Sequence, residues 1–375
     1  MNALQYAREL VAFDSVSSKS NVEVTSFVQA ALGRLGFEIE RLEYDDARGV
    51  RKACVVGKLG SGFGGLAYFG HTDVVPADPW FSSEHGPFQP TVKDGRLYGR
   101  GSCDMKGSVA CMLAAVERVR AATLEQPVYV TCTADEEIGY GGAREVAQRS
   151  RFFREMIAQG TKGIIGEPTN LEVVHAHKGT FGFVVTSLGK AAHSSTREGL
   201  NANLAMIPFL VEMKAIHDET NTDPAWQHAE FDPPTISWNI GINDHTHACN
   251  ITAPQSVCTV YFRPMPGQNP HLLLDRARQA AERCGLKYEL RSGAMPLYVD
   301  PQSEFIQELL QLADRSKATT VSYGTDGAMF TELKQLAVLG PGHIAQAHTW
   351  DEWIALEQLD RGAELYEKLI RQFCC

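Results

Sequence analysis

A histidine and several acids follow predicted strands at regular intervals along the first half of the chain. The apolar run 66–69 leads into His71, and the acids that come after later strands are Asp104, Glu136, Glu137 and Glu167. Successive positions are about thirty residues apart, the length of one strand-and-helix unit. This spacing predicts an open α/β sheet whose strand ends meet at one edge. The chemistry of the chain is therefore expected at that edge.

Hydrophobic periodicity predicts the organisation of the remaining chain. Strands and helices alternate through residues 1–178, which indicates a mostly parallel sheet flanked by helices. In residues 179–291 the order becomes βαββαβ, the pattern of a ferredoxin-like α+β unit. The α/β pattern resumes in residues 292–375, which contain His348. We therefore predict one α/β domain, formed by the first and last segments, with a second domain inserted into it.

Two local patterns carry specific expectations. Ser20–Glu23 reads as a capping box at the start of a helix that ends at Gly36. Gly60–Gly65 spells GxGxxG, but the dinucleotide fingerprint requires a helix directly after it. A predicted strand follows instead. The glycine segment is therefore predicted to be a hairpin turn rather than a nucleotide site.

Composition limits the partners of this 375-residue chain. Its hydrophobic content of 44% and charged content of 21% are typical of soluble globular proteins. The net charge of -10 argues against nucleic acid or an anionic membrane surface as a partner. No stretch approaches the about 20 apolar residues that a membrane helix needs, and the first residues lack a signal-peptide pattern. Nine cysteines without CxxC spacing favour reduced thiols, so we expect a soluble, cytoplasmic protein.

The acids and histidines have ordinary interpretations when each is considered alone. His71 could be a satisfied core histidine, Asp104 a helix N-cap and His348 a surface residue. Taken together, they would concentrate carboxylates in one crevice, and such a concentration needs a cation. Imidazole and carboxylate ligands without thiolate suit Zn²⁺, with Co²⁺ or Mn²⁺ as substitutes. Two histidines and three acids are too many for one zinc ion but suit two that share a carboxylate and hold a hydroxide between them.

Five short motifs resemble those of the co-catalytic zinc aminoacylase and exopeptidase family. They occur in the family's order at residues 70–73, 99–107, 133–137, 166–169 and 192–195. The family includes acetylornithine deacetylase, succinyl-diaminopimelate desuccinylase, aminoacylase and carboxypeptidases. The resemblance covers almost the whole chain and implies hydrolysis of an amide bond in a small N-acyl amino acid or a peptide.

The resemblance implies that two zinc ions are held by five residues. It assigns His71 and Glu167 to one zinc ion. It assigns Glu137 and His348 to the other zinc ion, and Asp104 to the position that bridges the two. The peptide bond that follows the bridging aspartate is expected to be cis. Cys103 departs from the family pattern, in which another small residue is expected beside the bridge.

Two further residues of the first domain receive roles from the resemblance. Asp73 would orient the imidazole of His71 through its other ring nitrogen, as a carboxylate two residues away can do. Glu136 would be the general base that takes a proton from the bridging water and returns it to the leaving amine.

The inserted domain would supply the remaining groups and act as a lid hinged near Lys178. His193 resembles the family histidine that stabilises the tetrahedral oxyanion, often from the partner subunit of a dimer. Asn250 and Arg263 match positions that bind the substrate's α-carboxylate, and an arginine can bind a carboxylate bidentately. The simpler alternatives are a loop histidine for His193 and a structural ion pair for Arg263. A homodimer formed through the inserted domain is therefore expected.

The substrate is predicted from two longer segments. Residues 166–179 and 339–352 are most similar to the acetylornithine deacetylase branch, which predicts hydrolysis of Nα-acetyl-L-ornithine to ornithine and acetate in arginine biosynthesis. Asp326 could meet a cationic substrate side chain or be a turn residue. The alternatives are another N-acyl amino acid hydrolase (an acetylcitrulline deacetylase, a desuccinylase or an aminoacylase), a dipeptidase or carboxypeptidase of the family, and an inactive metal-binding relative.

Overall fold

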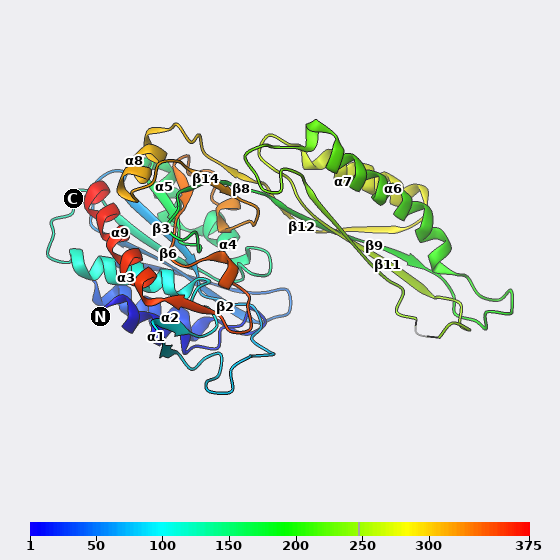
Figure 1. Cartoon of the computed structure of the whole chain (residues 1–375), viewed down its shortest axis with the longest axis horizontal. Coiled ribbons are helices and arrows are strands. Elements are labelled where there is room, and N and C mark those ends of the chain that lie inside the picture. The colour runs from blue at the N-terminus through cyan, green and yellow to red at the C-terminus, as the bar shows by residue number, and fades with distance from the viewer. Residues whose placement is uncertain (247) are drawn as a thin grey trace. The chain divides into compact units, whose positions relative to one another are not determined.

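The computed structural model describes every residue except 247, and the chain forms two compact units (Figure 1). The first unit comprises Met1–Ala176, Val299–Thr319 and Thr325–Cys375. The second unit comprises His177–Tyr298 and Thr320–Gly324. Among the described residues, no helix is both long and apolar enough to cross a membrane.

A nine-stranded sheet forms the centre of the first unit, in the order β1-β2-β6-β3-β7-β15-β8-β13 with β14 paired to β8. The strands are β1 (Glu38–Asp45), β2 (Arg51–Leu59), β3 (Leu66–His71), β6 (Val128–Thr133), β7 (Lys162–Ile165), β8 (Val174–His177), β13 (Leu297–Tyr298), β14 (Thr319–Val321) and β15 (Leu336–Val338). The four neighbours β6, β3, β7 and β15 pair in parallel. Strands β1, β2 and β6 pair antiparallel, as do β15 and β8. The sheet is therefore mixed, with parallel pairing at its centre.

The register of the parallel strands brings their carboxyl ends together. His71, the last residue of β3, lies opposite Thr133, the last residue of β6. Phe69 lies opposite Ile165, which ends β7. Residues that directly follow these three strands therefore start from the same edge of the sheet, as expected for a doubly wound fold.

Adjacent residues of β3 show that helices cover both faces of the sheet, since successive strand side chains point in opposite directions. Tyr68 packs edge-on against Tyr366, with ring centroids 5.5 Å apart, and Phe69 packs against Phe153 at 6.3 Å. Tyr366 belongs to α9 (Leu356–Cys374) and Phe153 to α5 (Arg151–Gln159). On the face of α9 the core also includes α1 (Ala3–Val11), α2 (Val22–Arg34), α3 (Lys106–Val119) and α8 (Glu304–Leu312). The short helix α4 (Gly141–Arg149) packs against β1, β2 and β6.

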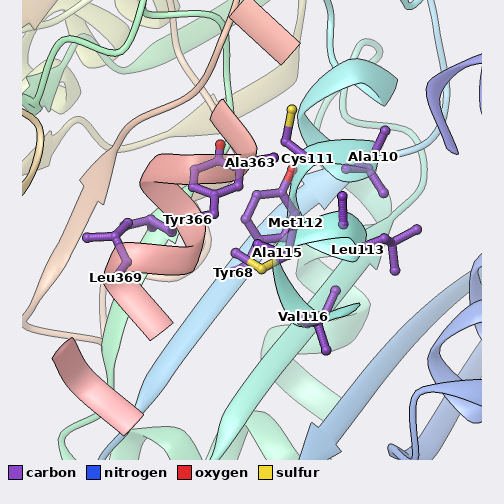
Figure 2. Packing of buried hydrophobic residues seen from close by; sticks show 14 of the residues in the cluster. Tyr68, Ala110, Cys111, Met112, Leu113, Ala115, Val116, Ala363, Tyr366 and Leu369 are labelled. Carbon is purple, nitrogen blue, oxygen red and sulfur yellow. The ribbon is translucent and has the colours of Figure 1, made fainter. Parts of the chain in front are cut away.

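The helix α3 is buried on nearly all sides because α1 and α9 both pack against it. Its apolar residues Met112, Leu113 and Val116 are buried, as their helical spacing predicts. Figure 2 shows Met112 and Ala115 of α3 beside Tyr68 and Tyr366. This packing holds the start of α3, two residues after Asp104, against the sheet.

The predicted capping box at Ser20–Glu23 is wrong. Helix α2 begins at Val22 with Asn21 as its N-cap residue, and no side-chain cap bond is formed. The side-chain amide of Asn21 instead donates to Thr72 Oγ1 at 3.0 Å. This tertiary contact uses the side chain that would otherwise cap the helix. A capping box does occur at α1, between Asn2 and Gln5, which the sequence interpretation missed.

The glycine segment Gly60–Gly65 is not a hairpin turn. Strands β2 and β3 are not neighbours, because β6 lies between them in the sheet. The segment is therefore a connection that passes the end of β6. At Gly65 φ is +81° and a Cβ would lie 1.9 Å from the Pro127 carbonyl oxygen, so only glycine fits this approach. Since β3 follows rather than a helix, the dinucleotide interpretation fails as expected.

The second unit has the predicted order βαββαβ. Its elements are β9 (Thr180–Leu188), α6 (Ala202–Thr222), β10 (Ser237–Asn243), β11 (Gln255–Arg263), α7 (Pro270–Arg283) and β12 (Lys287–Ala294). The sheet order is β10-β11-β9-β12, with antiparallel pairing throughout. Helices α6 and α7 pack against this sheet and against each other. Strand β10 forms one edge of the sheet.

A small sheet of three strands completes the first unit. It contains β4 (Thr91–Lys93), β5 (Arg96–Tyr98) and β16 (Trp353–Ala355) in the order β16-β5-β4. Trp353 pairs with Tyr98, so the sheet joins two segments that are far apart in the chain. One segment leads into Asp104 and the other follows His348.

Candidate active site

The predicted ligands of the first unit lie together at the carboxyl edge of its sheet. Ligand atoms of His71, Asp104 and Glu137 lie within 4.8 Å of one another, and so do those of His71, Glu136 and Glu167. The acids that follow successive strands therefore lie close together, as their spacing predicted, and their role as metal ligands stays a prediction. Each member reaches it from the end of a strand or from a loop at the same edge.

Asp104 occupies the centre of two overlapping groups. Its Oδ1 lies 3.1 Å from His71 Nε2, and its Oδ2 lies 3.5 Å from His348 Nε2. His71 Nε2 also lies 3.6 Å from Glu167 Oε1, whereas His348 Nε2 lies 3.0 Å from Glu137 Oε2. Each imidazole thus shares Asp104 and has one further carboxylate. This is the arrangement that a pair of cations with one bridging carboxylate requires.

Burial and like charge make this concentration of carboxyl groups unfavourable without a cation. Burial, followed by the charge of Glu167, raises the pKa of Glu136 well above its usual range. Burial and the charge of Asp104 raise the pKa of Glu167 in the same way. The pKa of Glu137 is also raised, chiefly by burial. In the absence of a metal these groups would hold protons to relieve their mutual repulsion.

The two histidines compensate part of this negative charge. Hydrogen bonds with Asp104 and Glu137 raise the pKa of His348 to about 10. Burial lowers the pKa of His71, but the hydrogen bond with Asp104 and the charge of Glu167 outweigh it and raise the pKa well above its usual value. Hydrogen bonds from both imidazoles lower the pKa of Asp104 against the opposing effect of burial.

The donor set fits a pair of divalent metal ions. Glu137 Oε1 is buried and has no hydrogen-bond partner among the described residues, so it is a carboxylate oxygen available to a cation. The contacting groups are imidazole nitrogens and carboxylate oxygens, which suit zinc and its substitutes. Cys103 does not join them, since its Sγ faces the His343 carbonyl oxygen at 3.4 Å and burial raises the pKa of its thiol. The peptide bond between Asp104 and Met105 is cis, as the resemblance implies.

Asp73 orients His71 through its main chain rather than through its carboxylate. His71 Nδ1 donates to the Asp73 carbonyl oxygen at 2.9 Å, while the carboxylate Oδ1 is 3.7 Å away. A carbonyl only accepts, so the Nδ1 proton is fixed and the Nε2 lone pair faces Asp104 and Glu167. The carboxylate instead accepts from the Glu136 amide at 3.2 Å and from Ser17 Oγ at 2.7 Å. Asp73 therefore also holds the backbone of Glu136.

A buried ion pair that the sequence interpretation missed supports the loop of Glu136 and Glu137. Lys52 Nζ lies 2.7 Å from Asp135 Oδ1, and Tyr44 donates its hydroxyl to Asp135 Oδ2 at 2.8 Å. Lys52 is fully buried. Asp135 has a φ of 58°, a left-handed conformation that this pair of contacts holds in place. The available signal was weak, because β2 begins with two basic residues, Arg51 and Lys52, and only the second of them is buried.

Asp326 lies in the first unit as a buried residue of a short 3₁₀ turn (Asp326–Ala328). Its Oδ2 accepts a hydrogen bond from Thr133 Oγ1 at 2.5 Å, at the end of β6. Burial raises the pKa of Asp326 to about 7. In this structure the carboxyl group is turned toward the strand end, and its predicted contact with a cationic substrate group stays a prediction.

The predicted oxyanion-stabilising residue His193 and the predicted substrate-binding residue Asn250 are neighbours in the second unit. His193 and Ile251 form an isolated antiparallel bridge, and Ser194 N donates to the Asn250 carbonyl oxygen at 2.9 Å. Both His193 and Asn250 are exposed. His193 follows the end of β9 at Leu188 by five residues and lies in the isolated bridge with Ile251.

Arg263 lies at the opposite end of β11 from that pair. It is the last residue of β11, and its Nη1 lies 3.4 Å from Thr180 Oγ1 at the start of β9. The strand is nine residues long. At about 3.3 Å per residue its ends are about 26 Å apart. Asn250 lies beyond the other end, so one chain does not bring Asn250 and Arg263 to the same small substrate.

Fold and site together define a metal-dependent amidohydrolase, and comparison with known proteins shows its family. Residues 67–372 match the family described as peptidase family M20/M25/M40, and the chain belongs to this family. The chain is 33% identical to an acetylornithine deacetylase of Myxococcus xanthus, over 98% of this chain and 96% of that protein. It is 31% identical to an acetylornithine deacetylase of Proteus mirabilis, over 99% and 96% of the two chains.

Solved structures share the fold at low sequence identity. A family metallo-carboxypeptidase of Sulfolobus solfataricus superposes with a TM-score of 0.79 at 15% identity, covering 100% of this chain and 99% of that one. Human carnosine dipeptidase 1 superposes with a TM-score of 0.73 at 18% identity, covering 99% and 96%. These similarities establish the fold. At such low identity they do not establish the substrate.

Proposed function

We propose that this protein hydrolyses Nα-acetyl-L-ornithine to ornithine and acetate with two zinc ions, and so supplies ornithine for arginine biosynthesis. The observation that carries the chemistry is the pair of overlapping imidazole–carboxylate groups that share Asp104 and adjoin Glu136. The choice of substrate rests on the acetylornithine deacetylases named above, at 33% and 31% identity over nearly the whole chain.

Five residues would hold the metal ions, in the two sets suggested by the distances. His71 and Glu167 form one set and His348 and Glu137 the other, and Asp104 belongs to both. Bound zinc ions would polarise the acyl carbonyl and lower the pKa of water to about 7. Co²⁺ and Mn²⁺ accept the same donors and would be substitutes.

Glu136 would act as the general base. Its carboxyl group is buried beside His71 and Glu167, and its raised pKa suits a group that accepts a proton near neutral pH. It would take a proton from the attacking water and deliver it to the amine nitrogen as the amide bond breaks. Asp73, which accepts from the Glu136 amide, would keep this carboxylate in reach of the water.

His193 would stabilise the oxyanion that forms on the acyl carbon. The Ser195 backbone N–H donates to His193 Nδ1 at 3.3 Å, so Nδ1 lacks a proton and Nε2 carries one in the neutral ring. Nε2–H is therefore a hydrogen-bond donor of the kind an oxyanion needs. Arg263 would bind the substrate α-carboxylate, because its charge has no ion-pair partner among the described residues.

The separation of Arg263 from His193 and Asn250 supports a homodimer in which these groups come from different chains. A substrate the size of acetylornithine is shorter than the roughly 26 Å along β11. Arg263 from one chain and the pair His193–Asn250 from a second chain would resolve this conflict. We infer that the second unit contributes His193 and Asn250 to the site of the partner subunit.

The second unit also presents an apolar surface suited to such a partner. We call Leu204, Ile207 and Val211 of α6 with Ile242 of β10 the α6–β10 face; all four are exposed. A groove of about 360 Å³ lies along it, lined by Ile207, Ile242 and their neighbours. Strand β10 is an edge of its sheet, with backbone groups free to pair with a second strand. An apolar helix stripe beside an open strand edge suits association with a second chain.

The decisive experiment compares kcat/KM for zinc- or cobalt-loaded protein on acetylornithine, acetylcitrulline, acetylmethionine, succinyl-diaminopimelate and a dipeptide. The Glu136→Gln variant should lose about 10²- to 10⁴-fold in kcat while it keeps its metal. Glu308→Gln is the matched control, because Glu308 pairs with Lys162 away from the cluster and should leave kcat unchanged.

The outcomes separate chemistry from substrate. A clear preference for acetylornithine that Glu136→Gln abolishes would establish both parts of the proposal. Preference for another acylated amino acid or for the dipeptide would replace the substrate and retain the chemistry. Activity that is undiminished in Glu136→Gln would show that another group is the base.

A further inference from the structure

Glu352 connects two segments of the candidate site and has no role in the function proposed above. It lies four residues after His348 and directly before β16, and its side chain is 1% exposed. Backbone pairing places it beside the loop Gly99–Asp104, since the Gly99 amide donates to the Glu352 carbonyl oxygen at 3.0 Å. That loop contains turns rather than a helix or strand, so its amides need other acceptors.

The carboxylate of Glu352 supplies these acceptors. Its Oε1 accepts from the amides of Cys103 at 2.8 Å and Asp104 at 2.9 Å. Its Oε2 accepts from the Gly101 amide at 2.9 Å and from Arg100 Nη1 at 2.8 Å. Four donors saturate the two oxygens, and the arginine balances the buried charge. One side chain thus fixes three amides of the loop.

The Asp104 amide is the most informative of these donors. The Asp104 carboxylate must face both His71 and His348, whose Nε2 atoms lie 3.1 Å and 3.5 Å from its two oxygens. Fixing the backbone of Asp104 fixes the origin of that side chain. Because Glu352 follows His348 by only four residues, the same carboxylate also anchors the segment that carries the second imidazole. A shift of Glu352 would therefore change the spacing between Asp104 and His348.

We propose that Glu352 is a positioning residue that holds Asp104 and the His348 segment in the spacing required to bind two metal ions. The proposal rests on the metal centre inferred above and adds a residue that would not itself touch metal or substrate. Partners behind metal ligands contribute substantially to affinity, and their loss typically lowers metal affinity by about 10- to 100-fold. Glu352 would act in this way on two ligands at once.

The test measures Co²⁺ binding, which does not depend on knowing the substrate. In Glu352→Gln the amide has one acceptor oxygen, so in either orientation its NH₂ group faces two of the four donors. We expect Co²⁺ affinity, measured by competition with a chelator, to fall about 10- to 100-fold. The visible absorption spectrum of bound Co²⁺ should change as well, since the ligands around it are displaced.

A matched control separates positioning from general loss of stability. Leu369→Ala truncates a buried side chain of α9 that is labelled in Figure 2 and belongs to the hydrophobic core rather than to the hydrogen bonds of Glu352. It should lower Tm while leaving Co²⁺ affinity and spectrum as in the wild type. If Glu352→Gln lowers Tm to a similar extent but binds Co²⁺ like the wild type, Glu352 is structural only and the proposal is overturned.

A second variant covers the case in which Glu352→Gln does not fold. Glu352→Asp keeps the charge beside Arg100, so this variant should fold. Its side chain is shorter by one methylene, so it should bind Co²⁺ more weakly than the wild type does. Failure of both variants to fold would assign Glu352 to the fold and reject the positioning role. Wild-type protein that binds two Co²⁺ ions but hydrolyses none of the acylated amino acids would reject the proposed function and leave this inference intact.

Discussion

The two units of the chain hold their candidate residues in different ways. In the first unit, His71, Asp104 and Glu167 are buried and in mutual contact at the edge of a sheet. In the second unit, His193 and Asn250 are exposed and lie at the opposite end of β11 from Arg263. The first arrangement is complete within one chain. Under the function proposed above, the second needs a further group from a second chain, and the exposed α6–β10 face is the surface proposed to bind that chain.

The contrast also concerns charge. In the first unit, burial and mutual repulsion raise the pKa values of Glu136 and Glu167. A bound cation would relieve this repulsion. In the second unit, Arg263 has no ion-pair partner among the described residues, and burial followed by the charge of Arg263 lowers the pKa of Lys178 to about 8. The function proposed above uses the first region to hold metal ions and Arg263 of the second to bind an anionic group.

Metal removal should have the largest effect. Removal of all bound metal with a chelator should abolish hydrolysis, and addition of Zn²⁺ or Co²⁺ should restore it. Tm should also fall, because bound metal at about 100 times its Kd adds about 2.7 kcal/mol to the free energy of unfolding. Metal analysis beside the activity assay checks the result. Full activity in a chain shown to be free of metal would contradict the proposed centre.

Replacing His193 should have the next largest effect and should spare the metal. His193→Ala should lower kcat by about 10²- to 10³-fold, as expected when one oxyanion donor is lost. Its metal content and Tm should match the wild type, because the residue is exposed and lies outside the first unit.

Mixing inactive variants tests whether His193 acts across the dimer. In a heterodimer of His193→Ala and Glu136→Gln chains, one of two sites is intact if His193 comes from the partner, and none is intact if it acts within its own chain. Subunit exchange at equal ratio should therefore restore about a quarter of wild-type activity. No recovery after demonstrated exchange would place His193 in the site of its own chain.

Arg263 should affect binding more than turnover. Arg263→Met should raise KM by about 10- to 100-fold with a small change in kcat, since a charge-assisted bidentate contact contributes about 1.5–3 kcal/mol. Arg263→Lys should recover only part of this, because a lysine lacks the planar fork. A fall in kcat without any change in KM would argue against a carboxylate-binding role.

The α6–β10 face should show the smallest effect on the stability of the isolated chain. Leu204→Ser replaces an exposed side chain and should change the free energy of unfolding by at most about 0.5 kcal/mol. Leu369→Ala in the buried core should cost about 2–5 kcal/mol. The mass in solution, measured by light scattering, should nevertheless shift toward the monomer for Leu204→Ser alone. An unchanged monomer–dimer equilibrium would exclude this face as the interface.

Much of the fold could be predicted because local patterns record burial. The apolar runs at β3 and β6 and the helical spacing in α3 follow directly from which side chains face the core. The pairing of strands could not be predicted in this way. Strand β6 is inserted between β2 and β3, which follow each other in the chain, so a connection was mistaken for a hairpin. Pairing depends on distant segments, and local sequence does not record them.

The amino-acid sequence by itself determined the chemical character of the candidate site. The types of residues such as His71, Asp104 and Glu167, and their positions after apolar strands, predict a metal site. Acids and imidazoles buried together are tolerable only around a cation. Only the tertiary structure decided how these groups are supported: the hydrogen bond from Ser17 to the Asp73 carboxylate, the Lys52 ion pair, and the four donors around Glu352. These contacts join segments up to about 250 residues apart, and chain folding alone brings them within hydrogen-bond distance.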